Sequence, residues 1–140
     1  MLTTIMEWKK SYETGNTVVD SEHKEIFTLV QKVMDATFTS RKEKVNTAVD
    51  FLTSYTLKHF SHEERLMQES AYPDMQKHKA QHKAFAESVG VLVQKINASG
   101  ETLQLSNEIN TVVVDWLIDH VLGSDMLLTV HYRDWQKNNR

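Results

Sequence analysis

Two pairs of residues that can bind metal occur at a spacing of four in the middle of the chain. His59 and Glu63 form the first pair, and His78 and His82 form the second. Residues four apart share one face of an α-helix, so each pair can direct two ligand atoms at one point. Two helices joined by a short turn would bring three imidazoles and a carboxylate together, which indicates a metal site.

Three further residues extend this set to five histidines and two acids: His23, His120 and Asp125. A single zinc ion takes four ligands and would leave the other imidazoles buried without a role. Two metal ions fit better, because bridging carboxylates and a bridging oxygen would fill all but one position of two octahedra. The open position could take a small ligand. Imidazole with carboxylate suits iron, although affinity order alone leaves other metals open.

The stretches that carry these residues have the periodicity of amphipathic helices, with apolar residues at steps of three and four. Asp20 or Ser21 is expected to cap the first helix, and Ser40 with Glu43 fits a capping box before the second. The expected helices span about residues 20–38, 41–69, 74–97 and 103–122.

These helices predict an all-α fold, an antiparallel up-down-up-down four-helix bundle in one domain of 140 residues. We expect an irregular N-terminal arm over residues 1–19, which packs aromatic side chains on the bundle. A short C-terminal extension over residues 126–140 follows the last helix. Because consecutive helices alternate in direction, all seven residues of the set fall at the same end of the bundle.

His120 and Asp125 need a separate argument, because residues five apart lie about 140° apart around an ideal helix. They can converge if the helix is distorted near Gly123. They can also converge if Asp125 reaches over from the end of the helix.

Other polar residues near the set are expected to have different roles. His62 lies about 100° from Glu63 around the helix, so we expect it to be exposed and not a ligand. His131 has the same interpretation. Three acids are expected at the surface or supporting the ligands from outside: Glu22, Glu64 and Asp119.

The complete pattern resembles the hemerythrins, most closely the bacterial ones. It consists of His23, His59-x₃-Glu63, His78-x₃-His82 and His120-x₄-Asp125, with Trp8, Gly15-Asn16 and Asp20 ahead of it, Phe60 after the second histidine, and Tyr72-Pro73 before the third helix. The resemblance extends from about Trp8 to Asp125, and all seven ligand positions are filled.

The resemblance implies reversible dioxygen binding by an oxygen carrier, store or sensor. The implied cofactor is a pair of non-haem iron ions with a bridging oxo or hydroxo group. By this resemblance, one iron is held by His78, His82 and His120, the other by His23 and His59, and both are bridged by Glu63 and Asp125. The apolar wall of the ligand pocket is expected from Phe60, Trp116, Leu117 and Val121.

Two other functions stay open at this stage. One is a diiron oxidase or peroxidase, although ferritin-like enzymes use Glu-x-x-His motifs and this sequence contains none. The other is a protein that sequesters iron or zinc, against which the open coordination position argues weakly. We therefore expect a binding protein and not an enzyme.

Composition and charge limit the binding partners and the cellular compartment that we expect for this protein. The net charge of −3 gives no reason to expect nucleic acid or an anionic membrane, and the absence of cysteine rules out thiolate ligands. Residues 1–10 lack a basic region followed by an apolar run, and no apolar stretch is long enough to cross a bilayer. We expect a cytoplasmic protein, with a possible unidentified protein partner at residues 127–140.

Overall fold

The computed structural model describes residues 7–39, 42–99 and 103–139. Within these ranges the regular structure is helical and contains no strand. The helical elements are, in chain order, the 3₁₀ helix η1 (Lys10–Tyr12), α1 (Thr17–Thr39), α2 (Lys42–Glu69), α3 (Met75–Ser99), α4 (Leu103–Ile109), the π-helical segment η2 (Asn110–Asp115), α5 (Trp116–Leu122) and α6 (Ser124–Asn138).

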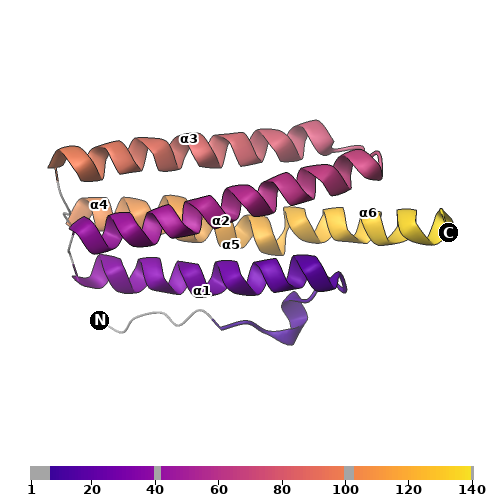
Figure 1. Ribbon diagram of the computed structural model, residues 1–140, viewed down its shortest axis with the longest axis horizontal. Coiled ribbons are helices and arrows are strands. Elements are labelled where there is room, and N and C mark those ends of the chain that lie inside the picture. The colour runs from indigo at the N-terminus through magenta and orange to yellow at the C-terminus, as the bar shows by residue number, and fades with distance from the viewer. Residues whose placement is uncertain (1–6, 40–41, 100–102, 140) are drawn as a thin grey trace.

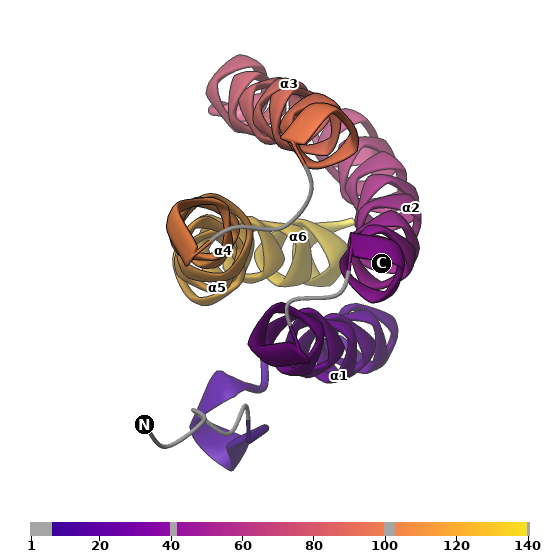
Figure 2. The same ribbon diagram turned by 90° about the vertical axis from the view of Figure 1, so that its left-hand side faces the viewer.

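The long helices form the predicted four-helix bundle. Figure 1 shows α1, α2, α3 and the continuous stretch from α4 to α5 lying side by side with alternating direction, and Figure 2 shows the same helices from one end. The turn between α2 and α3 lies at the end where α1 begins and toward which α5 runs. The prediction that the ligand-bearing ends of the helices coincide is therefore confirmed.

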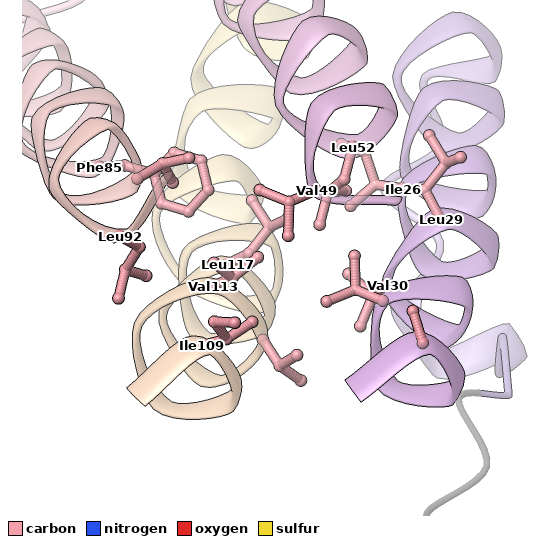
Figure 3. Close-up of a cluster of buried hydrophobic side chains, with 14 of the residues drawn as sticks. Ile26, Leu29, Val30, Val49, Leu52, Phe85, Leu92, Ile109, Val113 and Leu117 are labelled. Carbon is pink, nitrogen blue, oxygen red and sulfur yellow. The ribbon is translucent and has the colours of Figure 1, made fainter. Parts of the chain in front are cut away.

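An apolar core fills the bundle along the predicted helical stripes. Figure 3 shows side chains from α1, α2, α3 and the fourth helical stretch pointing toward one another. Burial of each large aliphatic or aromatic side chain stabilises the fold by about 1.5–3 kcal/mol. The labelled members are Ile26, Leu29, Val30, Val49, Leu52, Phe85, Leu92, Ile109, Val113 and Leu117.

Helix α1 begins at Thr17, three residues before its predicted start, and the predicted cap at Asp20 or Ser21 is wrong. Asn16 caps it instead, because its Oδ1 accepts a hydrogen bond of 3.1 Å from the backbone N–H of Val19. Asp20 binds the preceding loop, where its Oδ1 accepts hydrogen bonds from the N–H and the hydroxyl of Thr14. For the second helix, Ser40 of the predicted capping box lies outside the described residues.

The N-terminal arm packs aromatic side chains on the bundle, as predicted. Its described part, residues 7–16, contains η1. Trp8 makes an edge-on contact with Phe27 at 5.3 Å between ring centroids, and Tyr12 lies 5.6 Å from the same ring. These contacts cover α1 close to His23, whose ring lies 6.4 Å from Trp8.

The predicted C-terminal extension is present, and most of it forms the helix α6. Figure 1 shows α6 continuing past the turn between α2 and α3. Tyr132 packs with Val19 and Leu66 in a small apolar cluster, which holds α6 against α1 and α2. Exposed Leu127 and Val130 interrupt the one-sided apolar pattern that would have predicted this helix. Among the described residues, no helix is long and apolar enough to cross a membrane.

Candidate metal centre

All seven predicted ligand residues are buried at one end of the bundle and form two overlapping groups. Within each group, one ligand atom per residue lies within 4.8 Å of all the others. The larger group contains Glu63, His78, His82, His120 and Asp125, and the smaller contains His23, His59, Glu63 and Asp125. Because both groups share the two carboxylates, the arrangement suits two adjacent cations.

Asp125 lies at the centre of the arrangement. Its Oδ2 is 3.0 Å from Nε2 of His23 and 3.3 Å from Nε2 of His59. Its Oδ1 is 3.0 Å from Nε2 of His120 and 3.1 Å from Nε2 of His78. Burial alone would raise the pKa of Asp125, but the close contacts with His120 and the other imidazoles hold it well below its usual range.

Glu63 is the second shared carboxylate, and its environment differs from that of Asp125. Its Oε1 lies 3.2 Å from Nε2 of His82 and 3.5 Å from Nε2 of His59. Both carboxylate oxygens are nevertheless buried without a hydrogen bond to the described residues. Burial, and then the negative charge of Asp125, raise the pKa of Glu63 well above its usual value.

Several other buried atoms of the set also lack hydrogen bonds to the described residues. Nε2 of His78 and Oδ1 of Asp125 lie 3.1 Å apart, within ion-pair distance, yet their orientation forms no hydrogen bond. By contrast, Nε2 of His82 and Nε2 of His120 share a hydrogen bond of 3.1 Å, in which only one of the two nitrogens can donate. Unpaired buried polar groups are costly, and a cation would satisfy these lone pairs. The donor set therefore fits metal ions.

Of the two ways in which His120 and Asp125 were expected to converge, the structure shows a distortion at Gly123. Helix α5 ends at Leu122, Gly123 has φ −109° and ψ −81°, and α6 begins at Ser124. The N–H of Gly123 still donates to the carbonyl oxygen of Asp119 at 2.9 Å. The break changes the direction of the chain, so that Asp125, in the first turn of α6, faces the same centre as His120.

Acidic side chains outside the ligand set orient two of its imidazoles. Oε1 of Glu22 accepts a hydrogen bond of 2.9 Å from Nδ1 of His59, and Oε2 of Glu64 accepts one of 3.0 Å from Nδ1 of His82. Such bonds fix the ring orientation and direct Nε2 toward the metal. Burial lowers the pKa of His59, but hydrogen bonds to Asp125 and Glu22 outweigh it and raise this pKa to about 9.

The prediction that His62 is exposed is wrong. Its side chain is 19% exposed, and its Nδ1 donates a hydrogen bond of 2.8 Å to the same oxygen of Glu22 that His59 uses. The sequence argument measured the angle from Glu63, whereas His62 is only about 60° from His59 around the helix. The spacing of three between these two histidines was the signal for a shared partner. As predicted, His62 belongs to neither group of candidate ligands.

His131 is also less exposed than predicted. It is half-buried, and its Nε2 donates a hydrogen bond of 2.9 Å to the carbonyl oxygen of Ser70. Its ring lies 5.1 Å from that of Tyr72. His131 therefore links α6 to the end of α2 and belongs to neither candidate ligand group. Asp119 is exposed, as predicted for an acid that points away from the site.

Aromatic rings cover two of the imidazoles. Phe60 stacks on His82 with ring centroids 3.7 Å apart, and Trp116 stacks on His120 at 4.8 Å. Phe60 and Trp116 also meet edge-on at 6.4 Å. The two remaining residues of the predicted pocket wall, Leu117 and Val121, are buried in the same core cluster as Phe60.

Comparison with known proteins agrees with this geometry. Residues 14–129 match the family model described as the hemerythrin HHE cation binding domain. The chain belongs to the hemerythrin family. The matched range contains all seven candidate ligands.

Individual hemerythrins match nearly the whole chain. A bacteriohemerythrin of Methylococcus capsulatus is 33% identical over 125 residues, which cover 88% of this chain and 93% of that protein. A bacteriohemerythrin of Stenotrophomonas maltophilia is 28% identical over 121 residues, which cover 86% of this chain and 77% of that protein. The crystal structure of a wild-type hemerythrin superposes with a TM-score of 0.80 at 28% identity and covers 92% of this chain and 98% of its own.

Proposed function

We propose that this protein binds dioxygen reversibly at a non-haem diiron centre. The observation that carries the proposal is the sharing of Glu63 and Asp125 by two groups of buried imidazoles. Two carboxylates shared in this way place two cations next to each other, which a site for one zinc ion does not require. Membership of the hemerythrin family supports iron as the metal.

The proposed ligands follow the two groups. We assign His78, His82 and His120 to one iron, His23 and His59 to the other, and Glu63 and Asp125 to both, with an oxo or hydroxo group completing the bridge. Two bound ferrous ions would supply the electrons that reversible capture of dioxygen requires. Because His23 and His59 are only two imidazoles against three in the other group, a metal ion that they held would have more room for a small ligand.

The protein orients the ligand imidazoles and keeps water away from the proposed centre. Glu22 and Glu64 hold two imidazoles from behind, so their Nε2 atoms stay directed at the centre. Phe60, Trp116, Leu117 and Val121 form the proposed apolar wall of the dioxygen pocket. Such a wall excludes water and anions, which would otherwise promote oxidation of the iron.

The donor set favours a binding protein over an enzyme. Five imidazoles and two carboxylates provide little anionic charge to stabilise highly oxidised iron, in contrast to the Glu-rich sets of ferritin-like enzymes. The proposal includes a cytoplasmic location, which cell fractionation tests. It also allows for a protein partner at the exposed apolar residues Leu127 and Val130 of α6.

The deciding experiment measures metal content and the visible spectrum. Protein reduced without air and then exposed to it is expected to contain about two iron ions per chain. It should develop a charge-transfer band that disappears when oxygen is removed. Iron without a reversible band, but with turnover of peroxide, would establish the oxidase or peroxidase alternative. A metal content of one zinc per chain would overturn the diiron proposal.

A further inference from the structure

A small cavity opens beside the candidate metal centre, between the turn that joins α2 to α3 and the start of α6. Its volume is about 50 Å³, which has room for a few water molecules at most. His78, a member of the ligand set, lies in its wall, and its side chain is 3% exposed. The other lining residues used below are Tyr72, Asp74, Lys77, Gln81 and Ser124.

The cavity differs chemically from the aromatic cover over the other imidazoles. The rings of Phe60 and Trp116 lie flat on His82 and His120, and a hydrated cation loses its water shell when it crosses such a surface. Beside His78 the lining instead provides a phenol, a carboxylate, an amide and a hydroxyl group, together with the ammonium group of Lys77 and the apolar side chain of Leu127. Oxygen atoms of these kinds replace hydration water around hard divalent cations.

One hydrogen bond joins the two sides of the cavity. The hydroxyl of Ser124, at the start of α6, donates to Oε1 of Gln81 on α3 at a distance of 2.9 Å. Both side chains are half-buried, and Gln81 lies one turn of α3 beyond His78. Because both residues line the cavity, breaking this bond would remove a contact between the two walls beside His78.

The charges around the cavity favour cations. Exposed Asp74 lines the cavity, and His78 in its wall contacts the shared carboxylates Glu63 and Asp125. Burial raises the pKa of Tyr72, and the negative charges of Asp74 and Asp125 raise it further, so the field at this hydroxyl is negative. Exposed Lys77 also lines the cavity, and its positive charge opposes that of Asp74.

We propose that this cavity is the passage through which ferrous iron enters and leaves the centre, with the hydrogen bond between Ser124 and Gln81 as its closing contact. The proposal rests on the proposed metal site. In it, Asp74 attracts the hydrated cation, the oxygen atoms of the lining replace part of its water shell, and His78 is the first ligand that the cation reaches.

The test compares rates in both directions. Uptake of ferrous iron by metal-free protein is followed under nitrogen by stopped-flow, and release is followed with a ferrous chelator at concentrations where the rate no longer depends on it. Gln81→Ala removes the closing contact. We expect both rate constants to rise about 2- to 10-fold, the factor that corresponds to one hydrogen bond of ordinary net strength. The equilibrium affinity should stay unchanged.

Two matched variants control for the substitution itself. Gln76→Ala makes the same change at an exposed position of the same helix, and should leave both rates unchanged. Asp74→Asn should slow uptake, most strongly at low ionic strength, because it removes an attractive charge. Asp50→Asn changes an exposed acid of α2 that is absent from this cavity and should not slow it.

Two other results for Gln81→Ala would contradict the proposed passage. Faster release with unchanged uptake for Gln81→Ala would mean weaker binding, and unchanged rates in both directions would mean another route. Repeating the measurements with zinc separates this proposal from the proposed function, since zinc needs no dioxygen chemistry. Gated zinc exchange in a protein that lacks reversible oxygenation would support the passage and overturn only the function.

Discussion

Oε1 of Glu22 accepts a hydrogen bond of 2.9 Å from Nδ1 of His59. This contact joins α1 to α2 behind a candidate ligand, and Nε2 of the same imidazole lies 3.3 Å from Asp125. The pair therefore joins the partly exposed side chain of Glu22 on α1 to the fully buried imidazole of His59. Burial raises the pKa of Glu22, but hydrogen bonds from His59 and His62 outweigh it and lower this pKa, so the carboxylate stays ionised.

Glu22→Gln is expected to weaken metal binding about 10- to 100-fold, the usual effect of losing a carboxylate partner of a ligating histidine. The ring of His59 would keep a neutral partner but lose the charged one. Competition with a chelator of known affinity measures the change. Glu25→Gln, at an exposed position of the same helix, should bind metal as the wild type does. Equal affinity for both variants would contradict the supporting role.

Glu63→Leu is expected to separate metal binding from stability. The variant loses a carboxylate shared by both groups and should no longer hold two metal ions. The metal-free variant should nevertheless be more stable than the metal-free wild type by about 1–3 kcal/mol, because it no longer buries unpaired carboxyl oxygens. Urea unfolding after chelation measures this difference. A less stable metal-free variant would show that Glu63 is satisfied without metal.

The stability of the metal-free protein should fall as the pH rises from about 6.5 to about 9. The pKa of His59 is about 9 in the fold and near 6.5 in the unfolded chain. Protonated His59 therefore contributes stability that is complete below pH 6.5 and is lost as the pH rises through 9. Linkage gives a contribution on the order of 3 kcal/mol. Urea unfolding should show a smaller fall over this range for His59→Gln, and an equal fall would refute the shifted pKa.

Leu117→Ala is expected to leave a cavity in the proposed pocket wall, since the leucine is fully buried. The loss of stability should be about 2–5 kcal/mol, and water that enters the space should speed the irreversible oxidation of the oxygenated protein. Decay of the visible band measures the oxidation. Leu92→Ala removes the same side chain farther along the bundle and should cost similar stability without faster decay. Equal decay would place the pocket elsewhere.

Gly123→Ala is expected to weaken metal binding, because a Cβ atom at this position would lie 2.9 Å from the carbonyl oxygen of Asp119. The junction between α5 and α6 would have to shift, and Asp125 would move relative to His120. Gly90→Ala is the matched control, since its Cβ meets nothing within 4 Å. In a helix interior this change should add about 0.5–1 kcal/mol to stability and leave metal affinity unchanged. Calorimetry and chelator competition measure the two effects.

The sequence was most informative where one helix carries both members of a pair. The spacing of four between His59 and Glu63, and again between His78 and His82, predicts a shared face, and bundle topology then predicts which helix ends meet. Short-range periodicity is sufficient for such residues. Their convergence in the structure depends on nothing beyond regular helices and alternating direction.

The sequence was least informative where regular helix geometry ends. The start of α1 depends on which residue caps the helix. Asn and Asp are both good capping residues, so the sequence does not distinguish Asn16 from Asp20. The shared bond of His62 and His59 to Glu22 depends on how closely α1 approaches α2, which periodicity does not specify. The bond between Ser124 and Gln81 likewise depends on the angle at which α6 leaves Gly123.

Helix α6 is a single straight element that is held against the bundle by its second half. Its first turn carries Asp125, and Tyr132, two turns later, is fixed in the cluster with Val19 and Leu66. A helix of 15 residues is about 22 Å long. A force strong enough to tilt the outer end of α6 would therefore also move Asp125, because the chain changes direction at Gly123. Purification tags or fused domains are consequently better attached to the N-terminal arm, where they do not pull on α6 and displace Asp125.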